Sequence, residues 1–188
     1  MIKRNKIFLI ILIPLLVAVG ALWYFKYYKN AEIVQDYPFI NPELPLRYQD
    51  DDLDFFVDYP EGFVVNVTVE ENIKVLVFSK VGLNPPVGEA EESFQIFIMP
   101  YDEPGPITPE RILIDQPNII IKTPQTVQIA GEKALVFFST DPDIGDVREV
   151  WFVHPSTALG AGGHLFQAST YAKYDELLAK VMRTFRFR

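Results

Sequence analysis

Apolar and polar residues alternate over most of the chain from Leu53 onward. The segment 63–70, with the sequence FVVNVTVE, has an apolar residue at nearly every second position. A period of two residues is that of a β-strand that buries one of its faces. The same alternation, or a short apolar run between turn residues, recurs in the segments 53–58, 73–79, 94–99, 134–140, 147–154 and 164–171. We therefore predict a fold dominated by β-structure.

Two short segments have the pattern of helices instead. Thr108 and Pro109 make a good helix start, because threonine caps free backbone amides and proline suits the first helical position. Pro117 limits this helix to about two turns. The segment 174–183 begins with acidic residues and ends with basic ones, as the helix dipole favours. Its apolar face comprises Leu177, Leu178, Val181, Met182 and Phe185.

The order of these elements decides the fold class. Strands follow one another in hairpins, with one helix in the middle of the chain and one near its end. This order predicts an α+β fold with a mainly antiparallel β-sheet flanked by helices, an α/β/α sandwich, and not a doubly wound α/β fold.

Residues 7–25 form an apolar run of nineteen residues without a charge. As a helix with about 1.5 Å rise per residue, the run would extend roughly 29 Å, close to the hydrocarbon thickness of a bilayer. Basic residues precede it at positions 3, 4 and 6, and no acidic residue occurs before Glu32. By the positive-inside rule, we predict a single-pass protein of the cell membrane, with a basic cytoplasmic end at 1–6, a transmembrane helix at 7–25 and an extracytoplasmic C-terminal domain.

A cleaved signal peptide is the alternative to this anchor. The residues Ala18, Val19 and Gly20 resemble a small-residue cleavage site. The apolar run continues for five residues beyond Gly20, further than the apolar core of a typical signal peptide, so we favour the anchor. Prolines at positions 38, 42 and 45 then predict a semi-stiff linker over residues 26–52, followed by the folded domain at 53–188.

Charge and cysteine content narrow the classes of function. Beyond residue 30 the chain carries 12 basic and all 25 acidic residues, a net charge of −13. Such a domain repels nucleic acid, and we expect no nucleic-acid partner. The chain contains no cysteine, which excludes thiol catalysis and disulfides, so its stability must come from packing.

An acidic cluster lies where the folded domain is expected to begin. Its members are Asp50, Asp51, Asp52, Asp54 and Asp58. Clustered carboxylates suit Ca²⁺, but the glycine and the distal glutamate of an EF-hand loop are missing. We therefore interpret the cluster as a solvated edge of the domain.

The only histidines, His154 and His164, lie near the facing ends of two predicted neighbouring strands. Paired across that hairpin, they could bind a metal ion with an aspartate or glutamate as third ligand. The intervening segment 155–163 supplies no such ligand, so we favour histidines that are hydrogen-bonded to loop backbone and assign no metal or cofactor. The chain also has no Gly-x-Ser-x-Gly nucleophile motif, and its glycine-rich segment 160–163 leads into a strand, unlike a phosphate-binding loop.

Four short motifs resemble the PsbP/Mog1-like superfamily. They lie at residues 59–63 (YPEGF), 129–134 (IAGEKA), 166–169 (FQAS) and 181–187 (VMRTFRF). The resemblance covers about residues 53–187 and implies an antiparallel sheet between helices, in an exported and membrane-attached protein of the bacterial type. It implies no activity, because characterised members serve as extrinsic subunits of photosystem II or bind Ran. No functional residue of the family carries over to this chain.

These observations predict a non-enzymatic, membrane-anchored binding or assembly module with a protein partner in the cell envelope. The predicted contact surface lies between the two aromatic strands and loop 155–163, with the candidate residues Trp151, His154, His164 and Phe166. One alternative is an exported hydrolase or metal-dependent enzyme that uses the two histidines, which requires a pocket that holds both of them with an acidic residue. The other is a structural subunit of an envelope complex, which a broad exposed apolar patch would favour.

Overall fold

The computed structural model describes residues 42–82, 92–103, 105–141, 145–155 and 162–188. These residues belong to one compact unit, Ile40–Arg188. The predicted cytoplasmic end at 1–6, the transmembrane helix at 7–25 and the linker up to residue 41 lie outside the described residues. Within the described ranges, no helix is both long enough and apolar enough to cross a membrane.

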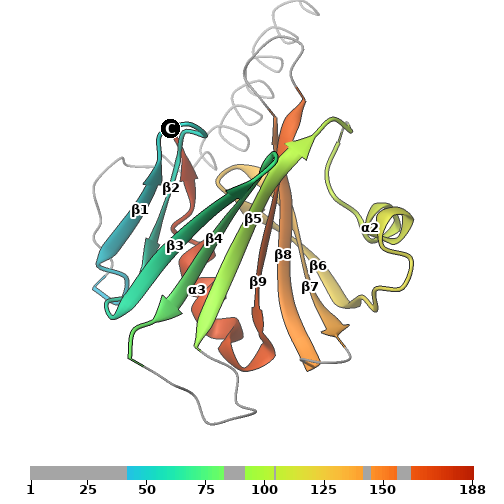
Figure 1. Ribbon diagram of the computed structural model, residues 1–188. Helices are drawn as coiled ribbons and strands as arrows, with labels where there is room; N and C mark the ends of the chain where they lie inside the picture. Colours follow the sequence, from blue (N-terminus) through green and yellow to red (C-terminus); the bar gives the residue numbers. More distant parts are fainter. Residues whose placement is uncertain (1–41, 83–91, 104, 142–144, 156–161) are drawn as a thin grey trace, which may run out of the picture. The chain divides into compact units, whose positions relative to one another are not determined.

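Seven strands of the described residues form one large sheet (Figure 1). In spatial order they are β3 (Phe63–Glu70), β4 (Ile73–Lys80), β5 (Ser93–Tyr101), β9 (Gly163–Tyr171), β8 (Gly145–Pro155), β7 (Glu132–Asp141) and β6 (Lys122–Ile129). Every neighbouring pair is antiparallel. The predicted segments match β3, β4, β5, β7, β8 and β9 closely. For β6, the apolar residues Val127 and Ile129 indicate only the end of the strand.

A second, small sheet contains β1 (Leu46–Asp50), β2 (Phe55–Tyr59) and β10 (Arg186–Phe187), with β2 in the middle. β1 lies inside residues 26–52, for which the sequence predicts a linker, so the folded part begins before residue 53. The sequence gives no signal for β1 because its inward-facing residues are Tyr48 and Asp50, and its aliphatic Leu46 is exposed.

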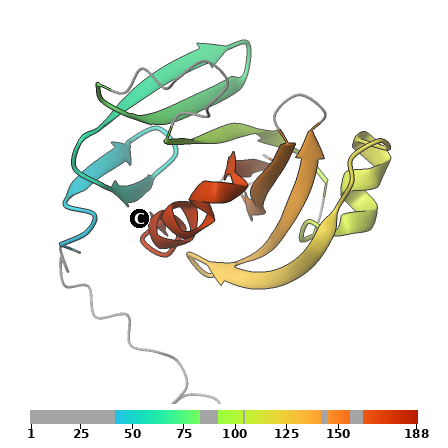
Figure 2. The ribbon, with the colours of Figure 1, turned by 90° about the horizontal axis from the view of Figure 1, so that it is seen from below.

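Two α-helices of the described residues cover opposite faces of the large sheet (Figure 2). They are α2 (Pro109–Asp115) and α3 (Asp175–Met182), the latter preceded by the 3₁₀ turn η1 (Ala172–Tyr174). The predicted start of α2 is confirmed, because the side chain of Thr108 caps it by accepting a hydrogen bond from the backbone N–H of Arg111. The architecture is therefore α+β on a mainly antiparallel sheet.

The larger hydrophobic core, here the α3-side core, lies between the large sheet, α3 and the small sheet. Phenylalanine rings stack within it, for example Phe152 on Phe166 at 5.1 Å and Phe78 on Phe94 at 4.4 Å between ring centroids. The smaller α2-side core lies on the other face of the large sheet. Its buried residues are Ile107, Ile112, Leu135, Phe137, Trp151 and Leu165.

Candidate functional site

The two aromatic candidates of the predicted contact surface lie in different cores. Trp151 is 6 % exposed and packs against Phe137 in the α2-side core, where its indole N–H donates to Glu149 at 3.0 Å. Phe166 is 1 % exposed in the α3-side core, directly opposite Phe152 on the neighbouring strand. Both side chains are thus buried within this chain on opposite faces of the sheet, and the structure does not bring them together at a surface.

The two histidines do come together. His154 on β8 and His164 on β9 are directly opposite each other in the antiparallel register, so their side chains point to the same face. The Nδ1 atom of His154 lies 3.1 Å from Oε1 of Glu132 on β7, and its ring stacks on Phe187 with 3.5 Å between centroids. The described partner of this histidine is thus a carboxylate, and most of the loop whose backbone the sequence suggests as its partner, residues 156–161, lies outside the described residues. Burial and the nearby charge of His154 lower the pKa of His164.

This row of side chains supplies little coordination chemistry. Glu132, on the strand next to β8, is already bonded to His154. A carboxylate in this position orients an imidazole, as in many metal sites. Among the residues that the structure describes, however, no group of three or more potential metal ligands converges.

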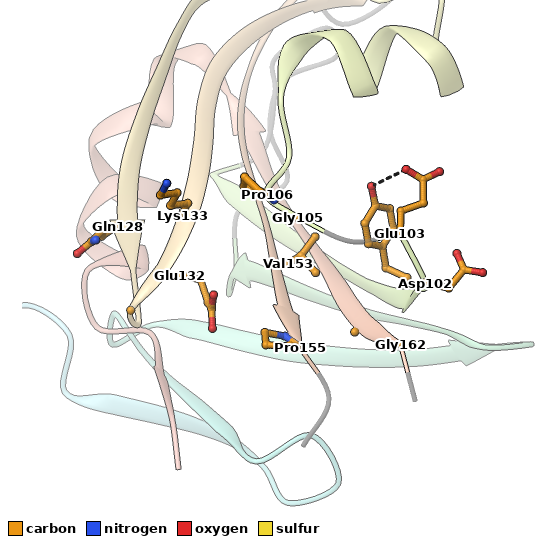
Figure 3. A pocket seen from close by; sticks show the side chains of 13 residues that line it. Asp102, Glu103, Gly105, Pro106, Gln128, Glu132, Lys133, Val153, Pro155 and Gly162 are labelled. Atoms are coloured by element: carbon orange, nitrogen blue, oxygen red, sulfur yellow. Dashed lines mark hydrogen bonds between the residues drawn. The ribbon is translucent and has the colours of Figure 1, made fainter. Parts of the chain in front are cut away.

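An open pocket of about 600 Å³ lies at the same end of the sheet (Figure 3). Its walls come from the end of β5, the β6–β7 turn and the ends of β8 and β9. Two of its carboxylates are engaged, because Glu103 pairs with Arg111 and Glu132 contacts His154. Neither histidine lines this pocket. It therefore does not gather both histidines with an acidic residue, as the enzyme alternative requires.

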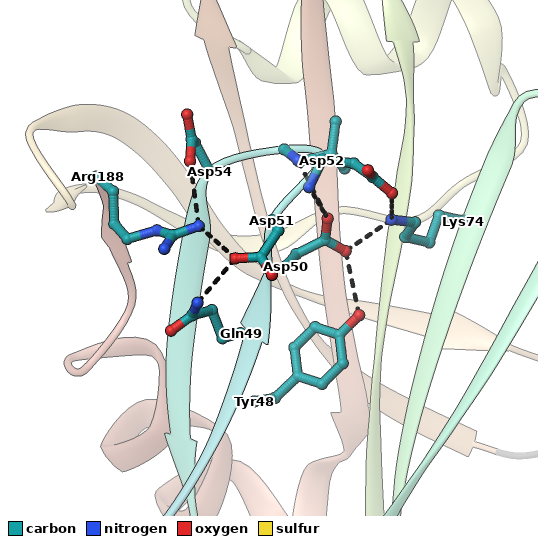
Figure 4. Close-up of polar contacts among 9 residues, drawn as sticks. Tyr48, Gln49, Asp50, Asp51, Asp52, Asp54, Lys74 and Arg188 are labelled. Carbon is teal, nitrogen blue, oxygen red and sulfur yellow. Dashed lines mark hydrogen bonds and ion pairs between the residues drawn. The ribbon is translucent and has the colours of Figure 1, made fainter.

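The acidic cluster is built into the fold (Figure 4). Asp50 is 4 % exposed, and one of its oxygens accepts hydrogen bonds from Lys74 at 2.7 Å and from the hydroxyl of Tyr48 at 3.1 Å. Its other oxygen accepts from the backbone N–H groups of Asp52 and Leu53. Burial by itself would raise the pKa of Asp50, but these hydrogen bonds and the charge of Lys74 lower it below its ordinary value.

Two arginines neutralise further members of this cluster. Asp58 is buried and binds the guanidinium of Arg47 through both of its oxygens, at 2.6 and 3.2 Å. Arg188 bridges Asp51 and Asp54 at 2.8 and 3.1 Å. The interpretation of the cluster as a solvated edge is therefore wrong for Asp50 and Asp58, whose partners come from strands that the sequence pattern does not pair.

β3 forms one edge of the large sheet, and no described strand pairs with its outer side. The N–H of Val81 donates to the C=O of Gly62 at 2.7 Å, which makes these two residues a hydrogen-bonded pair. Such pairs alternate with non-bonded pairs along an antiparallel ladder. The bond from the N–H of Lys80 to the C=O of Glu92 on the other side of β4 fits the same alternation. The β3 residues whose N–H and C=O point outward are therefore Phe63, Val65, Val67 and Val69.

Several side chains along this edge are apolar and exposed. The exposed fractions are 44 % for Val64, 48 % for Val67, 62 % for Val69 and 37 % for Ile73 at the start of β4. β3 contains no proline, glycine, lysine or arginine, and its one charged residue is Glu70. We call β3 together with Ile73 the β3 edge surface. Sequence alternation identifies the strand, but its place at the edge depends on the strand order, which no local pattern contains.

The opposite edge, β6, is irregular. Its pairing with β7 shifts register between Lys122 and Gln125, Pro124 lies in the interruption, and Thr123 has a positive φ of 47°. Bulges and prolines of this kind discourage an added strand. Of the two edges, only β3 offers an uninterrupted ladder of backbone groups.

Comparisons with known proteins give a resemblance in fold. No family model matches the chain, and no curated protein matches it. Among solved structures, the chain is similar to the solution structure of cyanobacterial PsbP (CyanoP) from Synechocystis sp. PCC 6803. The match has 12 % sequence identity, covers 82 % of this chain and 99 % of that chain, and has a TM-score of 0.48. We derive neither a family nor a function from this similarity.

Proposed function

We propose that this chain is a binding or assembly module, held at the outer side of a cell membrane by the predicted helix at 7–25, whose folded unit meets a protein partner at the β3 edge surface. The observation that carries the proposal is the set of exposed apolar side chains along a sheet edge whose one charged residue, Glu70, lies at its end.

Single exposed apolar residues are common on protein surfaces and need no explanation. Here, however, three valines of one strand and an isoleucine of the next lie on adjacent strands. Val67 and Val69 lie on one face of the sheet, and Val64 and Ile73 lie on the other, so exposed apolar side chains flank this edge on both faces. Exposed apolar groups gathered along one edge are typical of a site that another protein covers. Such an edge favours assembly with another protein. It therefore suits both the predicted binding module and the alternative of a structural subunit of an envelope complex.

The salt bridge between Lys74 and Asp50, next to the β3 edge surface, suits a role in binding. Lys74 on β4 binds Asp50 on β1 at 2.7 Å, and this bond ties the end of the β3–β4 hairpin to the small sheet. A docking surface on a fixed element loses less conformational entropy on binding than one on a loop.

Site-specific photo-crosslinking in intact membranes tests the proposal. A photoreactive residue at position 69 replaces the exposed Val69 of β3, and a matched one at position 114 replaces Ile114 of α2, which is 78 % exposed. We expect a discrete protein adduct from position 69 that position 114 does not give. Absence of an adduct at position 69, or the same adducts from both positions, would contradict the proposal.

The membrane attachment has its own test. We expect the chain to stay in the membrane pellet after alkaline carbonate extraction, with its N-terminal residues intact. A released protein that begins at Ala21 would show instead that residues before it are a cleaved signal peptide.

A further inference from the structure

Resting on the proposed function, we infer that the β3 edge surface binds an extended segment of the partner protein as an added β-strand, and that this segment is β-branched or apolar in its middle and carries lysine or arginine at its ends.

The backbone of β3 provides the first argument. Four alternate residues, from Phe63 to Val69, direct both N–H and C=O away from β4. An added strand would satisfy these groups with main-chain hydrogen bonds, and this gives affinity with little demand on the partner's sequence. The irregular β6 edge lacks such a continuous row.

The side chains of β3 define the middle of the added segment. Val65, Val67 and Val69 point to one face and Val64 points to the other, because successive residues of a strand alternate. Residues directly opposite on a neighbouring strand have Cβ atoms about 4.5–5.5 Å apart. β-Branched or apolar residues of the partner would therefore pack against these valines.

The charges at the ends of β3 define the ends of the segment. Glu61, Glu70 and Glu71 are exposed and form no ion pair with any described residue. The nearby lysines do not compensate them, because Lys74 binds Asp50 and Lys80 binds Glu92. Both ends of the edge are thus acidic, and complementary charge favours a partner with basic ends.

The same charges argue against a second copy of this chain. In an antiparallel pairing of β3 with itself, Glu61 of each copy would lie close to Glu70 and Glu71 of the other. Like charges brought together across a strand pair are destabilising. We therefore assign the edge to a different protein.

The test uses the full-length chain in detergent micelles and two labelled synthetic peptides. Each peptide alternates valine and threonine over seven residues, with two lysines at each end in one peptide and two glutamates in the other. Dissociation constants come from fluorescence anisotropy at low ionic strength. We expect the lysine peptide to bind at least about tenfold more tightly than the glutamate peptide, and the difference to shrink as salt is added.

Two proline variants locate the site. Val67→Pro removes an N–H that points away from β4 and so preserves the β3–β4 ladder, because proline is tolerated where the N–H faces solvent. Thr126→Pro is the matched change on β6: Ile129 and Glu132 flank a two-residue turn, which places the N–H of Thr126 on the outer side. We expect Val67→Pro to weaken binding of the lysine peptide at least about tenfold and Thr126→Pro to leave it unchanged.

A charge-reversal variant keeps the test decisive even if Val67→Pro unfolds. Replacing Glu70 and Glu71 by lysine should weaken binding of the lysine peptide and strengthen binding of the glutamate peptide, and both side chains are exposed. The inference fails if the peptides bind equally, if both proline variants weaken binding alike, or if sedimentation shows dimers that Val67→Pro abolishes. If any of these occurs while the adduct at position 69 still forms, the proposed function stands and the added strand does not.

Discussion

The two faces of the large sheet are covered very unequally. On one face, α3, the small sheet and residues near the C-terminal strand bury a continuous core that includes Phe55, Phe152, Phe166 and Phe185, all almost fully inaccessible. On the other face, the seven-residue helix α2 contributes one buried residue, Ile112. Stability is thus concentrated on the α3 side, while on the α2 side the side chains of β3 and β4 are largely exposed or half-buried. The β3 edge surface belongs to neither core alone, because Val67 and Val69 lie on the α3-side face and Val64 and Ile73 on the α2-side face.

The largest effect should follow from truncation in the α3-side core. Phe166 contacts the rings of Phe55, Phe152 and Phe185, with centroids 5.1–5.6 Å apart. We expect Phe166→Ala to lower the free energy of unfolding by about 3–5 kcal/mol, measured by urea denaturation. If Phe166→Ala lowers the free energy of unfolding no more than truncations on the α2 side do, stability is not concentrated on the α3 side.

The next effect concerns the buried carboxylate at the rim of the α3-side core. The pKa of Asp50 is lowered in the folded state, so its contribution to stability is present above its unfolded pKa of about 3.9 and is lost as the pH falls through the folded value. We expect Asp50→Asn to cost about 2–3 kcal/mol at pH 7, because it leaves Lys74 without its buried partner. In acid, the unfolding free energies of variant and parent should converge, and a gap that stays constant down to pH 2 would contradict this account.

A smaller and more local effect is expected on the α2 side. Ile112→Ala should cost about 2 kcal/mol, at the low end for a buried isoleucine, because one short helix relaxes easily around the lost volume. Hydrogen exchange should accelerate in α2 and remain slow in β8 and β9. Equal acceleration of exchange in all three elements would show that the two cores unfold as one unit, and would contradict the difference in stability between the two faces.

The smallest effect comes from a single hydrogen bond of the α2-side core. Burial raises the pKa of Glu149, although hydrogen bonds from Trp151 and Ser139 oppose this. Trp151→Phe removes one of the donors and should raise that pKa further, at a cost of about 1 kcal/mol near neutral pH.

The sign of this pH dependence is opposite to that of Asp50. A carboxyl with a raised folded pKa favours the native state below its unfolded pKa and loses this advantage as the pH rises through the folded value. The deficit of Trp151→Phe should therefore be small at pH 4 and larger at pH 8. The matched variant Ser139→Ala should change in the same direction.

The sequence predicts most of the large sheet and both α-helices, because each of these elements has a recognisable pattern within its own segment. Alternation marks β3, and the cap at Thr108 marks the start of α2. β10 escapes prediction because it has two residues, and β1 because its inward-facing positions are polar. Both strands exist because they pair with β2. Such pairings between separate segments leave no periodic pattern in the sequence of either strand.

The candidate site is predicted less well for a related reason. Alternation along β8 places Trp151 and Phe152 on opposite faces, but both side chains are buried, and the sequence of this strand does not show that neither of them reaches the surface. The contact of His154 with Glu132 requires that β7 lie beside β8, and the place of β3 at the edge requires that no described strand pair with its outer side. Both facts belong to the order of the strands.

The pairing of β10 with β2 also bears on when this protein can fold. Phe187 lies opposite Phe55, 132 residues earlier in the chain, and the ring of Phe185 stacks on that of Phe55 at 4.9 Å. During synthesis, β2 is made long before its partner, so the α3-side core cannot close until the segment around Phe185 has also been released. Contacts of such long range slow folding. A chain of this design becomes compact only after its last strand has been released, and its N-terminal strands wait for that strand in an open form.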